Sequence, residues 1–137
     1  MNPAELFRLE RDPLLLEQGE TLFRQGDRGD CMYVLLDGSV DILVGSTVVE
    51  SARPGALLGE MAMVDSSPRS ATVIATSDCK LARIDQFRFH FLVQQTPNFA
   101  TYVMKVMADR LRRMNVLANA AVDAQLGLTT PSIAEFP

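Results

Sequence analysis

The segment GEMAMVDSSPRSATV, residues 59–73, joins two apolar runs and carries an uncommon set of side chains for a connecting loop. Glu60 and Arg69 stand nine positions apart, and small residues lie beside both of them. A turn between two strands favours glycine or proline, but it needs neither of these charges. The segment therefore predicts a loop that joins two strands and also binds a ligand.

The order of residues within this segment indicates what the ligand is. Residues 60–64 are expected to form one helical turn, whose first backbone N–H groups have no partner and attract an anion. The planar guanidinium of Arg69 matches phosphate oxygens, and Ser70 adds a hydroxyl group. The carboxylate of Glu60 only accepts hydrogen bonds, so it suits a sugar hydroxyl. Together these groups predict a receptor for a phosphorylated ribose.

On both sides of the segment, short apolar runs alternate with turn residues about every 8–12 positions, which is typical of an antiparallel sandwich or barrel. We expect this barrel over about residues 14–84. A short helix is expected over residues 3–11, and Pro13 should end it. The turn signals are Gly26-Asp27, Gly29-Asp30, Asp37-Gly38, Gly45-Ser46 and Pro54-Gly55.

After the barrel the pattern becomes helical. Asp85 is a plausible N-cap for a helix over about 85–94, and Pro97 should begin a second helix over about 98–123. Two interpretations of the apolar seam in the second helix stay open: it packs on the barrel, or it forms a homodimer. We expect one domain over 1–123 and a flexible tail over 124–137. The seam consists of Val103, Met107, Leu111, Met114, Ala118 and Ala121.

Composition excludes several classes of function. The chain has 137 residues and a formal charge of −4, which disfavours binding to nucleic acid. No apolar run is long enough to cross a bilayer, and a cytoplasmic location is expected. Cys31 and Cys79 are expected to be buried thiols, and the single histidine, His90, leaves no histidine-based metal site. We expect no bound metal and no catalytic activity.

The segment resembles the phosphate-binding cassette of cyclic nucleotide-binding domains. This family includes the catabolite activator protein, the regulatory subunits of cAMP-dependent protein kinase and cyclic nucleotide-gated channels. The resemblance covers about residues 14–118, and residues 25–42, QGDRGDCMYVLLDGSVDI, match the glycine-punctuated strand pair of the family. It implies an α+β fold, mainly β: an antiparallel jelly-roll barrel followed by two C-terminal helices, with a short helix before it.

The resemblance also implies roles for individual residues. Glu60 would accept a hydrogen bond from the ribose 2′-hydroxyl, and Arg69 would neutralise the cyclic phosphate. The last helix can lie over the base, which would bring Arg110 and Met114 to the purine; the alternative is that both belong only to the helix surface. The other expected contacts are backbone groups at Gly59, Met61, Ala62, Ser70 and Ala71 and apolar side chains at Ile42, Val49 and Ala52.

The implied function is a sensor that binds a cyclic nucleotide and moves its C-terminal helices. We expect cAMP; cGMP stays open because the hydroxyl of Ser70 can bond a guanine amino group, and cyclic dinucleotides are more remote. Alternatives are a protein-interaction module without a nucleotide, or the sensor part of a bacterial transcription factor or a channel. A metal-dependent barrel enzyme would need a histidine cluster, and the residues after the long helix are too few for a DNA-binding domain. The sequence names no downstream partner.

Overall fold

The glycine and proline turns divide the chain into strands at the expected places. In the computed structural model, which describes residues 1–127, eight strands lie between Leu14 and Asp85. Glycines stand in several of the turns, because the left-handed backbone conformation there suits a residue without a Cβ atom. The strands are β1 (Leu14–Leu16), β2 (Thr21–Phe23), β3 (Cys31–Asp37), β4 (Val40–Val44), β5 (Thr47–Ala52), β6 (Leu57–Leu58), β7 (Thr72–Ala75) and β8 (Cys79–Asp85).

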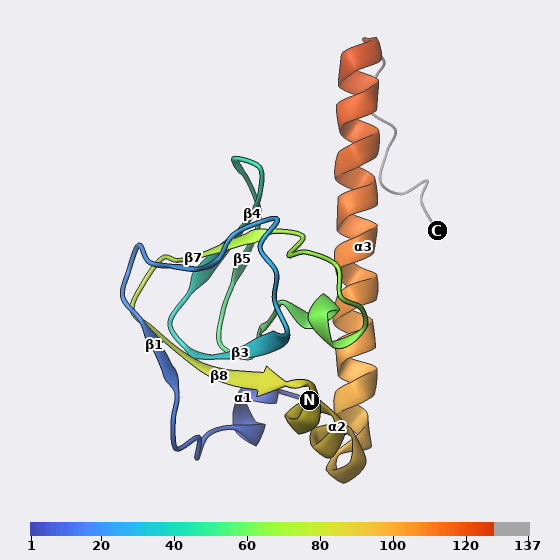
Figure 1. Cartoon of the computed structure of the whole chain (residues 1–137). Helices are drawn as coiled ribbons and strands as arrows, with labels where there is room; N and C mark the ends of the chain where they lie inside the picture. The colour runs from blue at the N-terminus through green and yellow to red at the C-terminus, as the bar shows by residue number, and fades with distance from the viewer. Residues whose placement is uncertain (128–137) are drawn as a thin grey trace. The chain divides into compact units, whose positions relative to one another are not determined.

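These strands form two four-stranded sheets within the described residues, with the orders β1-β8-β3-β6 and β2-β7-β4-β5. All neighbouring strands are antiparallel, and the two sheets face each other across an apolar core (Figure 1). The predicted α+β jelly-roll fold is thus confirmed. The core contains Leu35, Val40, Ile42, Ala52, Leu58, Val73, Ala75, Cys79 and Leu81.

The first helix is shorter than the sequence predicts. The expectation was residues 3–11, but α1 covers only Pro3–Leu6, with the side chain of Asn2 as its N-cap. Phe7 leaves the helical conformation, and its ring is buried, with 3% of its surface exposed. Burial of this ring and the ion pair of Glu10 with Arg88 outweigh the weak preference of a short segment for helix.

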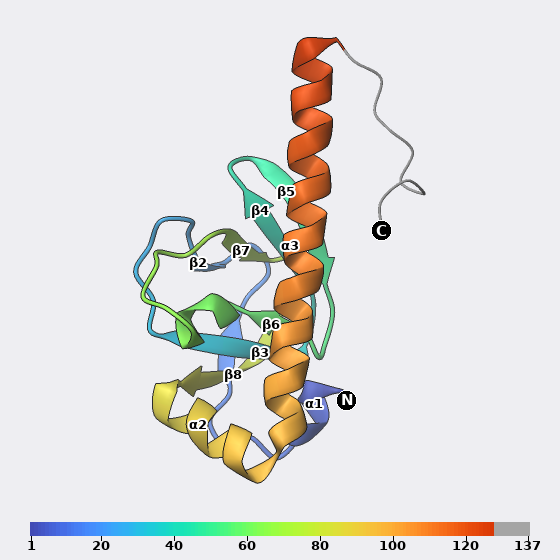
Figure 2. The same cartoon turned by 90° about the vertical axis from the view of Figure 1, so that its right-hand side faces the viewer.

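Two helices follow the barrel, as predicted (Figure 2). The α2 helix covers Gln86–Gln95, and the side chain of Asp85 accepts a hydrogen bond from the backbone N–H of Arg88 at 2.8 Å. This confirms Asp85 as the N-cap. The α3 helix begins at Pro97 and ends at Leu126. Phe99 is fully buried, and its ring contacts that of Phe89 edge to face, with centroids 6.1 Å apart.

The chain divides into two units, Met1–Val103 and Met104–Pro137, and each is described by itself. Most of the expected flexible tail, residues 128–137, lies outside the described residues. None of the helices within residues 1–127 is long and apolar enough to cross a membrane. The same residues contain no group of three or more histidine, cysteine, aspartate or glutamate side chains that could hold a metal ion.

Candidate ligand-binding site

The segment 59–73, which we call the cassette, begins with the expected helical turn. Residues Glu60–Met63 form a 3₁₀ helix, η1, and Gly59 before it has φ = 72°. A Cβ atom at Gly59 would collide with Nη1 of Arg69. Glycine is therefore required there for its backbone conformation and for the close approach of the arginine.

The other end of the cassette is fixed by the loop between β2 and β3. The backbone N–H of Gly26 donates to the carbonyl of Arg69 at 2.8 Å, and the N–H of Arg69 donates to the carbonyl of Asp27 at 2.8 Å. The N–H of Gln25 donates to the hydroxyl of Thr72 at 2.9 Å. These hydrogen bonds hold the end of the cassette around Arg69 against the β2–β3 loop, which lies more than forty residues earlier in the sequence.

The guanidinium of Arg69 is buried, with 7% of the residue exposed. Nη1 donates to the carbonyl of Gly59 at 3.2 Å, and Nη2 lies 3.8 Å from the sulfur of Cys31. The guanidinium carbon lies 4.2 Å from the centre of the Phe23 ring, within the range of a cation–π contact. Among residues 1–127, no acceptor reaches Nε, although this atom is buried. One donor of a buried cation thus lacks an acceptor within the described residues.

Glu60 is buried as well, with 5% exposed. Within the described residues, the buried polar or charged side chains are Glu60 and Arg69, and both belong to the cassette. Burying a charged side chain costs several kcal/mol unless partners compensate, so a small domain has little reason to do so for stability alone. The two charges that the sequence singles out are therefore also the two that the fold removes from water.

The remaining predicted cassette residues differ in exposure. Met61 and Ser70 are exposed, Ala71 is partly buried and Ala62 is buried. The N–H of Ala62 already donates to the carbonyl of Gly59 at 3.2 Å, so a ligand oxygen would have to share or replace this hydrogen bond.

The residues predicted to contact the base and the sugar fall into two groups, one in the barrel and one in the second unit. Ile42 and Ala52 belong to the barrel core, and Val49 packs against it. Arg110 and Met114 lie in the second unit, so their approach to a ligand stays a prediction.

Sequence reasoning missed three residues that surround Arg69: Phe23, Gly29 and Cys31. Gly29 was assigned only to a turn, yet a Cβ atom there would collide with Nε and the guanidinium carbon of Arg69. Cys31 was expected only as a buried thiol, and the structure confirms its burial. No local pattern links these three residues to Arg69, because only the sheet pairing and the hydrogen bonds of the β2–β3 loop bring them together.

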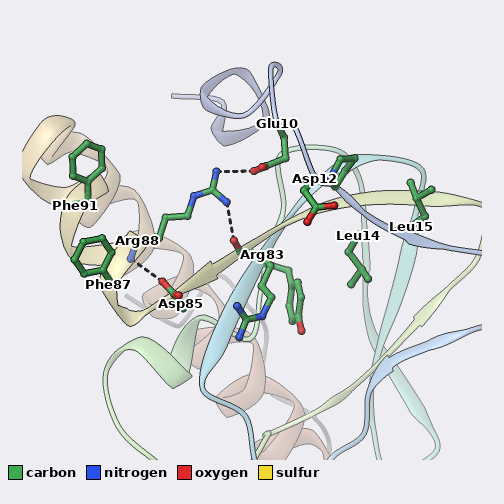
Figure 3. A pocket seen from close by; sticks show the side chains of 11 residues that line it. Glu10, Asp12, Leu14, Leu15, Arg83, Asp85, Phe87, Arg88 and Phe91 are labelled. Atoms are coloured by element: carbon green, nitrogen blue, oxygen red, sulfur yellow. Dashed lines mark hydrogen bonds and ion pairs between the residues drawn. The ribbon is translucent and has the colours of Figure 1, made fainter.

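A second feature of the first unit is an open hollow of about 690 Å³ beside α2, which we call the α2 groove (Figure 3). Arg88 spans it: Nη2 pairs with Glu10 at 2.6 Å, and Nη1 donates to the carbonyl of Arg83 at 2.9 Å. Burial raises the pKa of Tyr33, in the same groove, to about 12, and a hydrogen bond with Cys31 contributes less. The lining residues are Glu10, Asp12, Pro13, Leu14, Leu15, Tyr33, Arg83, Asp85, Phe87, Arg88 and Phe91.

Comparison with known families agrees with this geometry. The family model described as the cyclic nucleotide-binding domain matches residues 13–96, which is more than half of the chain. The chain belongs to the cyclic nucleotide-binding domain family. The matched region contains the whole cassette and ends at the residue before α3.

Individual relatives of this cyclic nucleotide-binding domain are longer proteins. A cAMP-dependent protein kinase regulatory subunit of Eremothecium gossypii is 37% identical over 75 residues, which cover 55% of this chain and 16% of the relative. The Pycsar effector protein XpPycTIR of Xanthomonas perforans is 32% identical over 74% of this chain and 34% of its own length. The crystal structure of the Thermus thermophilus catabolite activator protein matches with a TM-score of 0.72 and 26% identity, over 88% of this chain and 59% of that one. The chain thus spans about a sixth to three fifths of these relatives.

Proposed function

We propose that this domain is a sensor that binds a cyclic nucleotide, with cAMP as its ligand, and that it is not an enzyme. The observation that carries the proposal is the buried guanidinium of Arg69, whose Nε has no acceptor within residues 1–127. A singly charged phosphate diester would supply an acceptor and a compensating charge. The name of the kinase regulatory subunit among the relatives supports cAMP in particular.

In this proposal each end of the cassette contacts a different part of the ligand. Arg69 binds the cyclic phosphate together with backbone N–H groups near Met61, Ala62, Ser70 and Ala71. Glu60 accepts a hydrogen bond from the ribose 2′-hydroxyl. The apolar neighbours of the sugar or base are Ile42, Val49 and Ala52, and Arg110 and Met114 close over the purine.

Calorimetric titration of the nucleotide-stripped protein with cAMP and then with cGMP tests the proposal. We expect saturable binding of both, tighter for cAMP, and a rise in melting temperature with ligand concentration, because ligand that binds the folded state stabilises it. Tighter binding of cGMP would assign the hydroxyl of Ser70 to a guanine amino group. Absence of heat and of any thermal shift with both nucleotides would contradict the proposal and favour a protein-interaction module.

We further propose that the cassette passes the binding signal to α2 through Gln86. The side-chain amide of Gln86 donates to the carbonyl of Ala62 in η1 at 3.2 Å, so a displacement of η1 pulls directly on the first turn of α2. The ligand shifts this equilibrium only by its preference for one arrangement of the cassette. The hinge would lie at Thr96 and Pro97, between α2 and α3.

Backbone amide NMR spectra of the wild type and of Gln86→Ala, each with and without cAMP, test this route. We expect cAMP to shift the α2 signals in the wild type and to shift them much less in the variant, at nearly unchanged affinity. Equal α2 shifts in the two proteins would rule out Gln86 as the connection. Unshifted α2 and α3 signals in the wild type with bound cAMP would rule out helix movement altogether.

We also propose that the helix over 98–123 forms a homodimer and that the protein acts in the cytoplasm on a separate downstream protein. Support for the dimer comes from exposed apolar side chains along the helix in the second unit, where Leu111 is 63% exposed. Light scattering before and after Leu111→Lys tests it: we expect a dimer that becomes monomeric. A wild-type monomer at high concentration would contradict it. The other exposed apolar residues are Met104, Met114, Val116, Leu117, Val122 and Leu126.

A further inference from the structure

Cys31 occupies a junction between the cassette and the β3–β8 pair. It is the first residue of β3, lies opposite Asp85 of β8 and has 4% of its surface exposed. Its sulfur lies 3.8 Å from Nη2 of Arg69, within the distance of a weak N–H···S hydrogen bond. The sulfur therefore contacts the guanidinium that binds the cyclic phosphate in the proposed function.

The other contacts of this guanidinium set its plane but leave it able to bind an anion. The ring of Phe23 stacks on it at 4.2 Å, and the carbonyl of Gly59 accepts from Nη1 at 3.2 Å. Gly29 allows the close approach on the remaining side. A ring, a carbonyl and a thiol are all weaker partners for a guanidinium than a phosphate is, so the contacts orient the group without saturating it.

Cys31 is also close in the sheet to two residues that line the α2 groove. Tyr33 follows Cys31 by two positions in β3, on the same face of the strand, and pairs across the sheet with Arg83, which lies in the groove in Figure 3. Arg83 also pairs with Asp30 at 3.7 Å. The β3–β8 pairing thus fixes the place of Cys31, and with it the position of its sulfur beside Arg69.

We propose that Cys31 is a positioning residue of the cyclic phosphate site, whose sulfur orients the guanidinium of Arg69 without neutralising it. This inference rests on the proposed function and adds to it a residue that tunes affinity. A stronger acceptor at position 31 would compete with the ligand phosphate for Arg69. An apolar side chain there would leave Nη2 without its contact and the guanidinium less well oriented.

Four variants separate this role from a general role in packing. Cys31→Val should bind cAMP about threefold to tenfold more weakly, the effect of losing one hydrogen bond of modest strength. Cys31→Ser, which restores a polar acceptor, should recover affinity to within about threefold of the wild type. Cys31→Asp should bind at least about thirtyfold more weakly, because its carboxylate holds Arg69 and repels the phosphate.

Cys79→Val is the matched control, because Cys79 is buried to a similar degree but its sulfur contacts the carbonyls of Ser39 and Ser77. It should change stability without changing affinity. Titration calorimetry with cAMP and thermal unfolding are measured on all variants. In each ligand-free protein, the ¹⁵Nε resonance of Arg69 reports directly on the orientation of its guanidinium.

Wild-type affinity in folded Cys31→Val, or an equal loss in Cys79→Val, would overturn the inference. If Cys31→Asp does not fold, the affinities of Cys31→Val and Cys31→Ser still test the inference. A wild-type protein that binds no cyclic nucleotide refutes the proposed function instead. In that case the inference about Cys31 is decided by the Arg69 ¹⁵Nε resonance, which should shift in Cys31→Val and stay unchanged in Cys79→Val.

Discussion

Two arginines of the first unit make the same stacking contact but differ in their hydrogen-bond partners. Arg69 and Arg88 each stack on a phenylalanine, at 4.2 Å from the ring of Phe23 and 4.9 Å from the ring of Phe7. Arg88 donates to the carboxylate of Glu10 and to the carbonyl of Arg83, whereas Nε of Arg69 is buried and has no acceptor within the described part of the chain.

The hydrogen-bond partners of an arginine distinguish a structural role from a role in ligand binding. Stacking on a ring does not identify the site, because both arginines stack on a phenylalanine. The state of the donors does, since a structural guanidinium finds its partners inside the fold and a binding one keeps a donor for the ligand. The following predictions test whether this contrast holds.

The largest expected effect is the loss of ligand binding in Arg69→Ala. Removing the partner of a buried phosphate charge should cost about 2–5 kcal/mol, or about thirtyfold to several thousandfold in affinity for cAMP. Arg88→Ala should bind cAMP within about twofold of the wild type. Calorimetry measures the affinity of both variants for cAMP. An equal loss of affinity in the two would contradict the distinction between the arginines.

At Arg88 we expect an effect on stability instead of an effect on ligand affinity. Arg88→Ala should lower the free energy of unfolding by about 2 kcal/mol, because it leaves the largely shielded carboxylate of Glu10, 13% exposed, without its partner. Arg112→Ala, which breaks an exposed pair with Asp109, is the control and should cost less than about 0.5 kcal/mol. Denaturant unfolding measures the free energy of unfolding of both variants. Similar losses in the two would mean that the pair of Arg88 with Glu10 does not stabilise the fold.

A smaller effect should follow from filling the space beside Arg69. Gly29→Ala leaves the backbone unstrained but places a methyl group where the guanidinium lies, so the guanidinium must move. We expect about tenfold weaker binding of cAMP, equivalent to about 1.4 kcal/mol. Gly19→Ala, at φ = 90° with open space around it, is the control for backbone strain and should leave affinity unchanged. Unchanged affinity in Gly29→Ala would show that the exact position of the guanidinium is unimportant.

The smallest effect is on the pH dependence of stability. Burial raises the pKa of Tyr33 to about 12 in the folded chain, whereas the pKa of an unfolded tyrosine is about 10. Between these values the unfolded chain binds fewer protons, so the free energy of unfolding falls as pH rises. Because Tyr33 is partly exposed, we expect this loss to be about 1 kcal/mol in the wild type and absent in Tyr33→Phe. Parallel stability curves of the two proteins between about pH 9 and pH 12 would contradict the shift.

Several features were predictable from the sequence because they depend on neighbouring residues. Alternating apolar runs and glycine turns predicted two antiparallel sheets, Asp85 predicted the start of α2, and Pro97 predicted the start of α3. The sequence also singled out Glu60 and Arg69 by their types and spacing; both are buried, and their roles in binding stay predictions. The end of α1 was wrong, since burial of Phe7 shortens the helix and no local signal encodes that burial.

By itself, the sequence determined the fold class, the family and the two charged side chains of the cassette, because turn chemistry, apolar periodicity and a short motif are all local. Only the tertiary structure decided what surrounds Arg69. Phe23, Gly29 and Cys31 reach it from about forty residues earlier in the chain through sheet pairing and loop hydrogen bonds, and Gln86 of α2 reaches Ala62 of η1 through packing of the two helices. Such contacts depend on the register of strands and the packing of the core, and no pattern along the chain records them.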